Sequence, residues 1–221
     1  MKLESVGILV SLRPFGERDA IAHIFSRDFG VMVGLLRGAI VAKKNKPLVG
    51  QFGDVSWNAR IDSGLGVFHW EPTKNIVAPI MNSPEKLALV NSVFDLVTTL
   101  LPEREAYEKL YDKTYEFLLG LAGFGDFDAK YLDWEISLIG ELGYALDLSR
   151  CSGCGTTENL NYISPRTGRA VCDKCAAPYV AQLYKMPPTL DTAFKFLEKI
   201  CGDAGISMPI FRRMIAHKKI E

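Results

Sequence analysis

The motifs Cys151-Ser-Gly-Cys154 and Cys172-Asp-Lys-Cys175, two C-x-x-C pairs with 17 residues between them, decide how the second half of this chain folds. This spacing is typical of a structural zinc site. Two residues between cysteines allow a tight turn to direct both sulfurs at one ion. Four thiolates then complete a tetrahedral shell that leaves no open position for water or substrate. The pattern therefore predicts one structural Zn²⁺ held by Cys151, Cys154, Cys172 and Cys175.

The residues around the two pairs suit a small module at about residues 148–178. Gly153 and Gly155 can supply the positive φ angles that a metal-binding turn requires. Residues 161–171, between the pairs, are expected to form two short strands around a turn. The alternatives are two disulfides or unrelated buried thiols. Disulfides are disfavoured because we find no secretory signal and because a fifth cysteine, Cys201, lies at helical spacing among apolar residues, as a small core residue would.

The composition is typical of a soluble globular protein, with 48% hydrophobic and 24% charged residues. No apolar run approaches the roughly 20 residues of a membrane span, so we expect a cytoplasmic protein. The net charge is zero but uneven: +3 over residues 1–80, −7 over residues 81–150 and +4 over residues 151–221. Basic ends around an acidic middle indicate separate surfaces with separate partners.

The first 80 residues are predicted to be all-β. Five β-rich runs are bounded by Gly, Pro and Asp, which fits a small barrel or a sandwich. Gly34, inside the third run, predicts a bulge or a corner. The expected strands cover residues 6–12, 20–25, 31–36, 52–61 and 66–70.

From residue 81 the apolar residues recur at helical spacing, which predicts a helical domain over residues 81–221 with the zinc module inserted before its last two helices. Together with the strands this gives an α+β multidomain protein. The expected helix starts are Ser83-Pro84, a second near residues 103–105, a third capped by Asp128, a fourth capped by Thr189 and a last one near Pro209.

Basic residues in the first 80 positions are interleaved with turns and aromatic residues. Small five-stranded barrels bind single strands with a basic groove and stacking aromatic rings, so the pattern favours a nucleic-acid surface. Trp57 and Phe68 are either such rings or, as is commoner for aromatic residues in strands, part of the core. An ordinary solvated face is the alternative for the basic residues. The candidate DNA contacts are Arg13, Arg18, Arg37, Lys43, Lys44, Lys46 and Arg60.

Catalytic motifs are sparse. Neither G-x-S-x-G nor G-x-x-x-x-G-K-[ST] occurs, which argues against serine hydrolases and P-loop NTPases. His69-Trp-Glu71 matches half of a zinc deaminase motif, but Cys151 and Cys154 complete the metal shell without His69.

Several stretches resemble, in order, the bacterial recombination mediators of the RecO family. Near the N-terminus these are Gly7-Ile-Leu-Val-Ser-Leu-Arg-Pro-Phe-Gly-Glu-Arg-Asp19 and Leu36-Arg-Gly38 with its lysine-bearing loop. Further on, Trp134-Glu-Ile-Ser-Leu-Ile-Gly-Glu-Leu-Gly-Tyr-Ala-Leu-Asp147 leads into the first cysteine pair, and Tyr162-Ile-Ser-Pro165 leads to the second. The similarity covers nearly the whole chain.

The resemblance implies an N-terminal OB-fold at residues 1–80, a helical domain and a zinc-ribbon-like insertion. It implies a role without catalytic residues: binding of single- and double-stranded DNA, annealing of complementary strands and, with RecR, loading of RecA onto DNA coated by SSB. It places the protein in the bacterial cytoplasm at the nucleoid. The alternative from another class is a zinc-ribbon subunit of a nucleic-acid-modifying enzyme that uses the barrel as a binding module.

The resemblance also implies contact with the acidic C-terminal tail of SSB. A −7 middle segment would repel such a tail, so we expect a pocket rimmed by basic residues from the +4 segment that follows it. The candidates for this rim are Arg166, Arg169, Lys195, Lys199 and Arg212.

Overall fold

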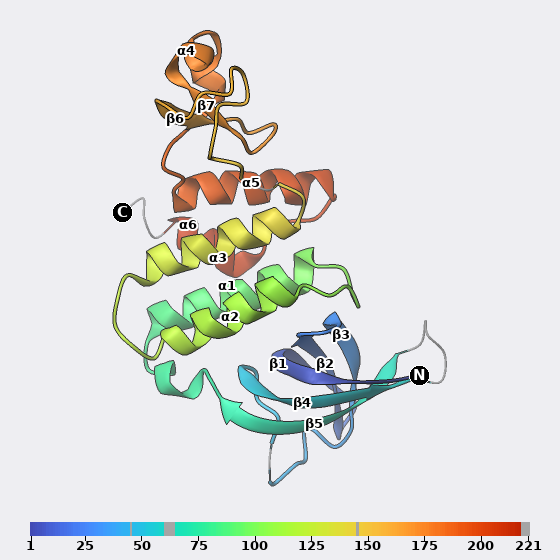
Figure 1. The fold of residues 1–221 in the computed structure, drawn as a ribbon. Coiled ribbons are helices and arrows are strands. Elements are labelled where there is room, and N and C mark those ends of the chain that lie inside the picture. The colour runs from blue at the N-terminus through green and yellow to red at the C-terminus, as the bar shows by residue number, and fades with distance from the viewer. Residues whose placement is uncertain (45, 60–64, 145, 218–221) are drawn as a thin grey trace. The chain divides into compact units, whose positions relative to one another are not determined.

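The computed structural model describes residues 1–44, 46–59, 65–144 and 146–217. The chain forms two compact units, unit 1 (Met1–Gly125) and unit 2 (Asp126–Glu221). Figure 1 labels their elements. The change from strands to helices lies at about residue 80, as expected, but the compact units divide further along the chain. Unit 1 therefore contains the strands together with the first two helices.

Unit 1 begins with a closed barrel in which the strand order is β1-β2-β3-β5-β4. β1 pairs antiparallel with both β2 and β4, and a short parallel pairing of β3 with β5 closes the barrel. This is the five-stranded barrel of an OB-fold, and it confirms that prediction. The strands are β1 (Lys2–Phe15), β2 (Asp19–Ser26), β3 (Gly30–Leu36), β4 (Gln51–Asn58) and β5 (Gly66–Asn75).

Alternating apolar residues fill the barrel. Ala20, Ala22 and Ile24 on β2 are fully buried, whereas the residues between them face outward. Trp57 is only 2% exposed and Phe68 4%, and the Trp57 indole donates to the Val33 carbonyl at 3.0 Å. Both rings therefore belong to the core, so the stacking alternative does not apply to them.

Gly34 lies at the barrel seam, and of the bulge or corner predicted there the bulge is absent. β3 runs without a register shift through Gly34, which pairs with Gly66 across the parallel seam. A Cβ at Gly34 would lie 2.8 Å from the Phe68 ring, so only glycine permits this close approach. The register shifts fall elsewhere, between Leu9 and Ser11 on β1 and between Phe52 and Gly53 on β4.

A short 3₁₀ turn, η1 (Ala78–Ile80), leads to α1 (Pro84–Leu100), and the side chain of Ser83 accepts the N–H of Lys86 as the predicted cap. The second helix, α2, is Glu108–Gly120, so the start expected near residues 103–105 is wrong. Arg104 has a φ of 60° and donates its N–H to the Val31 carbonyl at 2.9 Å, which ties this segment to β3 instead.

In unit 1, α2 packs on the barrel through two aromatic pairs. The Tyr111 ring of α2 meets Phe25 at 5.4 Å between centroids, and Tyr115 meets Phe52 at 4.8 Å. Arg27 adds an ion pair with Asp112 at 2.9 Å. These contacts explain why α2 clusters with the strands.

Unit 2 contains α3 (Phe127–Glu141), α5 (Leu190–Asp203) and α6 (Ile210–His217). Asp126 caps α3 by accepting the Ala129 N–H at 3.0 Å, so the cap expected at Asp128 is wrong. Thr189 caps α5 as predicted. No described helix is long and apolar enough to cross a membrane.

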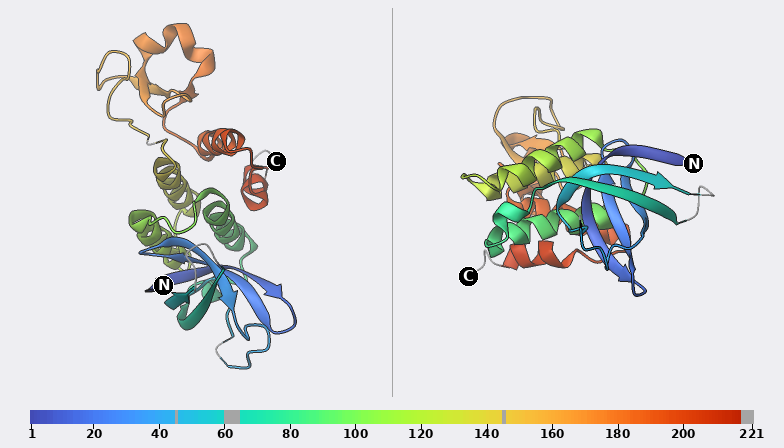
Figure 2. Two further views of the ribbon diagram at one scale, coloured as in Figure 1. Left: turned by 90° about the vertical axis from the view of Figure 1, so that its right-hand side faces the viewer. Right: turned by 90° about the horizontal axis from the view of Figure 1, so that it is seen from below.

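Between α3 and α5 lies a small module with a three-stranded sheet in the order β7-β6-β8. β8 pairs with β6 and returns the chain to α5, where the ring of Tyr184 meets Phe196 at 5.4 Å. Figure 2 shows the module and the barrel from two further sides. Its elements are β6 (Leu160–Ile163), β7 (Ala170–Cys172), α4 (Asp173–Ala176), η2 (Ala177–Gln182) and β8 (Tyr184–Lys185).

Candidate metal centre and nucleic-acid interface

The structure brings the four predicted cysteines together. The sulfurs of Cys151, Cys154, Cys172 and Cys175 all lie within 4.8 Å of one another. All five cysteines of the chain are free, which removes the disulfide alternative. Cys201 is buried in α5, as predicted for a core residue. Within the described residues no other group of His, Cys, Asp or Glu has a comparable geometry.

Backbone turns hold the cluster in place. The N–H of Gly155 donates to the Cys151 carbonyl at 2.9 Å, and Gly155 adopts the positive φ expected of it, 77°. Gly153 does not adopt the positive φ expected of it. A Cβ there would lie 3.0 Å from the Cys175 sulfur, so the absence of a side chain makes room for the cluster. Cys172 ends β7, and Cys175 follows within the single turn of α4.

The electrostatics of the cluster favour a cation. Burial opposes ionisation of the Cys151 thiol, yet N–H donors from Cys172, Cys154 and Gly153 together lower its pKa to about 6. Hydrogen bonds to the other three sulfurs raise the pKa of Cys175 to about 12. Without metal, protons must therefore be shared among the sulfurs, and a bound cation would replace them.

The apolar core of the module is small. Val171 and Ala176 are buried beside the two buried cysteines, and Leu160, Tyr162 and Leu183 cover them only partly. So few apolar side chains cannot hold loops of this length in place, which is the usual circumstance of a structural metal site.

Three of the four candidate arginines, Arg13, Arg18 and Arg37, are exposed at one end of the barrel. Arg13 lies opposite Ile21 on β2, and both face outward because Ala20 and Ala22 face the core. Arg37 directly follows Leu36, the last buried residue of β3.

Two hydrogen bonds join the loops that carry these arginines. The N–H of Ile40 donates to the Arg18 carbonyl at 3.0 Å, and the N–H of Gly38 donates to the Asp19 carboxylate at 2.7 Å. The β1–β2 turn with Arg18 therefore lies beside the segment with Arg37, and the structure brings Arg13, Arg18 and Arg37 into one region.

The lysine candidates lie further along the β3–β4 connection. Lys43, Lys44 and Lys46 are exposed, and the Lys46 carbonyl accepts the Gln51 amide at 3.3 Å. No hydrogen bond or ion pair of the described residues joins these lysines to the arginines. Arg60 lies outside the described residues.

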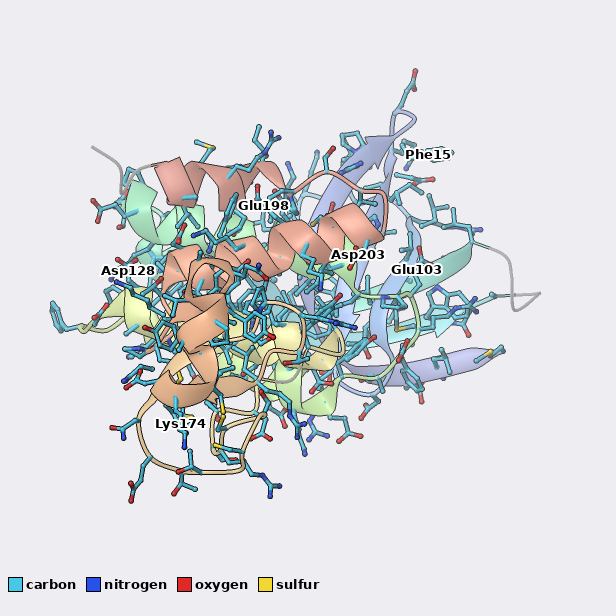
Figure 3. The ribbon with its side chains drawn as sticks, turned by 90° about the horizontal axis from the view of Figure 1, so that it is seen from above. Phe15, Glu103, Asp128, Lys174, Glu198 and Asp203 are labelled. Carbon is cyan, nitrogen blue, oxygen red and sulfur yellow. The ribbon has the colours of Figure 1, made fainter. Side chains whose placement is uncertain are left out.

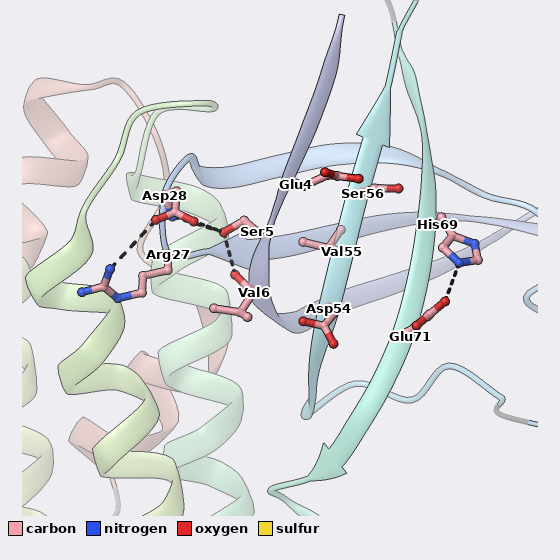
Figure 4. A pocket seen from close by; sticks show the side chains of 10 residues that line it. All are labelled: Glu4, Ser5, Val6, Arg27, Asp28, Asp54, Val55, Ser56, His69 and Glu71. Atoms are coloured by element: carbon pink, nitrogen blue, oxygen red, sulfur yellow. Dashed lines mark hydrogen bonds and ion pairs between the residues drawn. The ribbon is translucent and has the colours of Figure 1, made fainter.

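Another face of the barrel is acidic. A cavity of about 620 Å³ is lined by four carboxylates together with the Arg27 guanidinium and the His69 imidazole. Figure 4 shows it between β1, β4 and β5. Sequence reasoning missed this groove because its acids are far apart in sequence; cross-strand pairing, such as Asp54 with Glu71, brings them together. The carboxylates belong to Glu4, Asp28, Asp54 and Glu71.

Four of the five basic candidates in unit 2 are exposed. Lys195 and Lys199 lie one turn apart on α5, and the Lys199 ammonium reaches the Pro165 carbonyl at 3.5 Å, next to Arg166. Arg169 pairs with Asp147 at 3.4 Å. Arg166 and Lys199 therefore form a basic edge where the β6–β7 turn meets α5.

Arg212 is not on the rim that the sequence suggested. It is 0% exposed, and its guanidinium donates to both carboxylate oxygens of Glu135 and to the Leu190 carbonyl, the last at 2.7 Å. The rings of Tyr131 and Phe194 flank it at 5.9 and 5.2 Å. Burial raises the pKa of Glu135, against the pull of Arg212. The arginine joins α3, α5 and α6, and cannot receive a peptide from solvent.

A second cavity, of about 430 Å³, lies where β8 meets the start of α5. Tyr184, Met186 and Pro187 give it an apolar wall, while Lys185 and Lys195 supply positive charge. Lys195 also pairs with Asp191 at 2.6 Å. The cavity is therefore partly apolar, and its charged lining residues are Lys185, Lys195 and Asp191. Of the predicted rim residues, only Lys195 lines it.

Two family models match this chain in sequence order: "Recombination protein O N terminal" over residues 1–75 and "Recombination protein O C terminal" over residues 81–212. The chain is 39% identical to the DNA repair protein RecO of Jannaschia sp. (strain CCS1) over 203 residues, which is 91% of this chain and 82% of that protein. It is 38% identical to the RecO of Roseobacter denitrificans over 193 residues, 86% of this chain and 79% of the relative. The chain belongs to the RecO family of DNA repair proteins.

Proposed function

We propose that this protein is a non-enzymatic recombination mediator of the bacterial cytoplasm and nucleoid. It binds single- and double-stranded DNA, anneals complementary single strands and, with RecR, helps to load RecA onto SSB-coated single-stranded DNA. The observation that carries the DNA-binding part is the exposed group Arg13, Arg18 and Arg37 at one end of a five-stranded barrel. The partnerships with RecR and RecA rest on family membership.

Arg13, Arg18 and Arg37, which we call the arginine end of the barrel, are better suited to bind phosphate than the acidic cavity is. Guanidinium groups bind phosphate oxygens through paired N–H donors and carry no sequence information, as a strand-annealing protein requires. The acidic groove with Asp54 and Glu71 would repel phosphate, so it restricts DNA to other faces of the barrel. The lysines Lys43, Lys44 and Lys46 extend the positive charge along the chain from Arg37.

We assign the cysteine cluster to Zn²⁺. Four thiolates in a tetrahedral arrangement suit this ion, and a closed shell leaves no position for substrate. The ion would therefore supply folding energy to the module, and the residues that hold it are Cys151, Cys154, Cys172 and Cys175.

We assign the SSB tail to the cavity beside β8 and α5. Lys185 and Lys195 would pair with its carboxylates, and the wall formed by Tyr184 and Met186 would cover its apolar end. A tail carboxylate would compete with Asp191 for Lys195. The basic edge at Arg166 and Lys199 would steer the tail from further away, whereas Arg212 takes no part.

DNA binding tests the first part of the proposal. Fluorescence anisotropy with a labelled single-stranded oligonucleotide should give wild-type binding that weakens steeply with salt. The Arg13→Ala/Arg18→Ala/Arg37→Ala variant should bind at least about 10-fold more weakly, with a salt slope lower by about 0.7 for each lost contact. Lys109→Ala/Lys130→Ala removes two exposed charges elsewhere and serves as the control. A triple variant that binds as wild type does at low and moderate salt would place the DNA surface elsewhere.

The alternative, an enzyme subunit, makes a different prediction for the same preparations. A mediator should anneal complementary oligonucleotides without consuming nucleotide or changing a base. Chemical turnover of DNA, RNA or a nucleotide that accompanies binding would favour the enzyme subunit.

The SSB assignment is tested with a fluorescent acidic peptide that ends in an apolar residue. It should bind wild type better than a scramble of the same charge, and Lys185→Ala/Lys195→Ala should remove that preference. Equal binding of the peptide and its scramble to wild type would reject the cavity as the tail site.

A further inference from the structure

The β1–β2 end of the barrel displays an aromatic ring that the core does not use. Of the phenylalanine and tryptophan residues in the described part of the barrel, Phe15 alone is exposed, at 58%. Figure 3 labels Phe15 at this end of the strands, with its ring projecting away from the ribbon. One exposed apolar side chain is unremarkable by itself, so its surroundings must decide its meaning.

The surroundings of Phe15 are basic. Arg13 lies two residues earlier on β1 and therefore shares the outward face of the strand with Phe15. Phe15 pairs with Asp19, and Arg18 lies in the turn between them. Asp19 also accepts the N–H of Gly38, which places the segment carrying Arg37 next to the Phe15–Asp19 pair.

The turn that follows Phe15 is held by hydrogen bonds, and there is free space beside it. The hydrogen bonds from Ile40 to Arg18 and from Gly38 to Asp19 attach the turn to the β3–β4 connection. Nothing lies within 4 Å of the position that a Cβ would take on Gly16, which follows Phe15 with a φ of 67°. Three arginines surround the ring against two acids, Glu17 and Asp19, so the local net charge is +1.

We propose that Phe15 is a stacking platform for an unpaired nucleobase, with Arg13, Arg18 and Arg37 holding the adjoining phosphates. This inference rests on the proposed DNA-binding function and adds a preference to it. Bases stack on an aromatic face whatever their identity, which suits a protein that reads no sequence. In a duplex the faces of the bases are covered by their neighbours. Phe15 therefore makes the arginine end selective for single strands, whereas phosphate contacts alone would serve both forms.

The loop between the first two strands is also a sound position for such a platform. OB-folds contact oligonucleotides through the β1–β2 loop and the outer face of strands 2 and 3. In this barrel Ile21 and Leu35 lie side by side on that face, opposite Arg13, and are partly exposed. The base next to the one stacked on Phe15 would then lie against the apolar side chains of Ile21 and Leu35, between the arginines.

The test compares Phe15→Ala with Phe15→Tyr, which keeps the ring. Binding of a labelled single strand and of a duplex with the same sequence is measured by anisotropy at two salt concentrations. Phe15→Ala should bind the single strand about 5- to 150-fold more weakly, the range expected for one stacked base, with an unchanged salt slope. Its duplex affinity should stay within about twofold of wild type. Phe15→Tyr should behave as wild type.

Two controls separate stacking from other effects. Phe124→Ala removes a fully exposed phenylalanine, 100% accessible, from the connector that follows α2, and should change nothing. A stretch of abasic sites keeps the phosphates and removes the bases; wild type should bind it more weakly than normal DNA, and Phe15→Ala should bind both alike. Phe15→Trp gives a direct signal, because its exposed indole fluorescence should be quenched by normal but not by abasic single strands.

The outcomes distinguish this inference from the function on which it rests. If wild type and the triple arginine variant behave as proposed but Phe15→Ala retains full affinity for single strands, stacking is rejected and DNA binding stands. Equal losses for single strand and duplex also reject stacking. If wild type binds no DNA, both proposals fall.

Discussion

Unit 1 and unit 2 are stabilised by different chemistry. The barrel of unit 1 buries a continuous set of apolar residues, and the polar residues buried with unit 1, such as Gln51 and Thr114, are neutral. Unit 2 contains both of the buried charged residues among those described, Glu135 and Arg212, together with the cluster of four thiols.

The two units should therefore differ in how easily a substitution disrupts them. Apolar packing is non-directional, so the barrel tolerates the loss of any one polar contact. Thiolates and buried charges require specific partners, and each partner left alone is costly. Unit 2 should therefore be the more easily disrupted part of the molecule, whereas the proposed DNA-binding end belongs to the more robust part.

Removal of the metal should give the largest effect. Wild type should contain about one zinc ion per chain, whereas Cys172→Ser should lose it, since three thiolates no longer close the shell. Elemental analysis measures the zinc, and hydrogen exchange locates the damage, which should stay within about residues 148–185.

Cys201→Ala is the matched control, because Cys201 is a buried cysteine outside the cluster. It should retain zinc. Rapid exchange spreading through β1 to β5 of the Cys172→Ser variant would contradict the comparison, because the barrel would then depend on the metal.

The buried ion pair should give the next largest effect. Arg212→Met leaves the Glu135 carboxylate buried without its partner and should cost about 3–5 kcal/mol in urea unfolding. Replacing both residues, as Arg212→Met/Glu135→Leu, should recover most of that loss. If the single variant is as stable as wild type, the helices of unit 2 do not depend on the pair, and the contrast with unit 1 weakens.

The smallest effect should come from the exposed pair Arg27–Asp112 in unit 1. The hydrogen bond from Arg27 lowers the pKa of Asp112, so its stabilisation is present above the ordinary pKa of an aspartate and is lost as the pH falls through the lowered value. Because solvent screens the exposed Arg27–Asp112 pair, its contribution to the stability of the fold is small. Asp112→Asn should therefore shift the melting temperature slightly at pH 7 and not at all at strongly acidic pH. A shift that persists in acid would assign the effect to packing of Tyr111 and Tyr115 rather than to charge.

The sequence predicted the parts of the molecule that local patterns encode. Alternation of apolar residues predicted the strands, and C-x-x-C spacing predicted the cysteine cluster. The position of Arg212 could not be predicted, because its partner Glu135 lies 77 residues away and neither residue has a local signal for burial. The acidic groove was missed for the same reason, because strand register brings its carboxylates together. The start of α2 was misplaced because the contact of Arg104 with Val31 is long-range and overrides the local helical preference.

The exposure of Phe15 could not be predicted from the sequence either. Its sequence neighbours Arg13 and Arg18 were recognised as candidates, but Phe15 lies beyond the predicted strand at residues 6–12, so no local pattern indicated where its ring would lie. Only the extension of β1 beyond the predicted strand, to Phe15 itself, places the ring outside the core.

Strand annealing tests the central claim most directly, namely that the arginine end of the barrel handles DNA without enzymatic chemistry. Two complementary labelled oligonucleotides are mixed, without nucleotide, with wild type or with Arg13→Ala/Arg18→Ala/Arg37→Ala, and energy transfer reports duplex formation. Wild type should accelerate annealing well above the spontaneous rate, and the triple variant should lose most of that acceleration while its zinc content and melting temperature stay unchanged. No acceleration by wild type, or equal acceleration by the variant, would contradict the account.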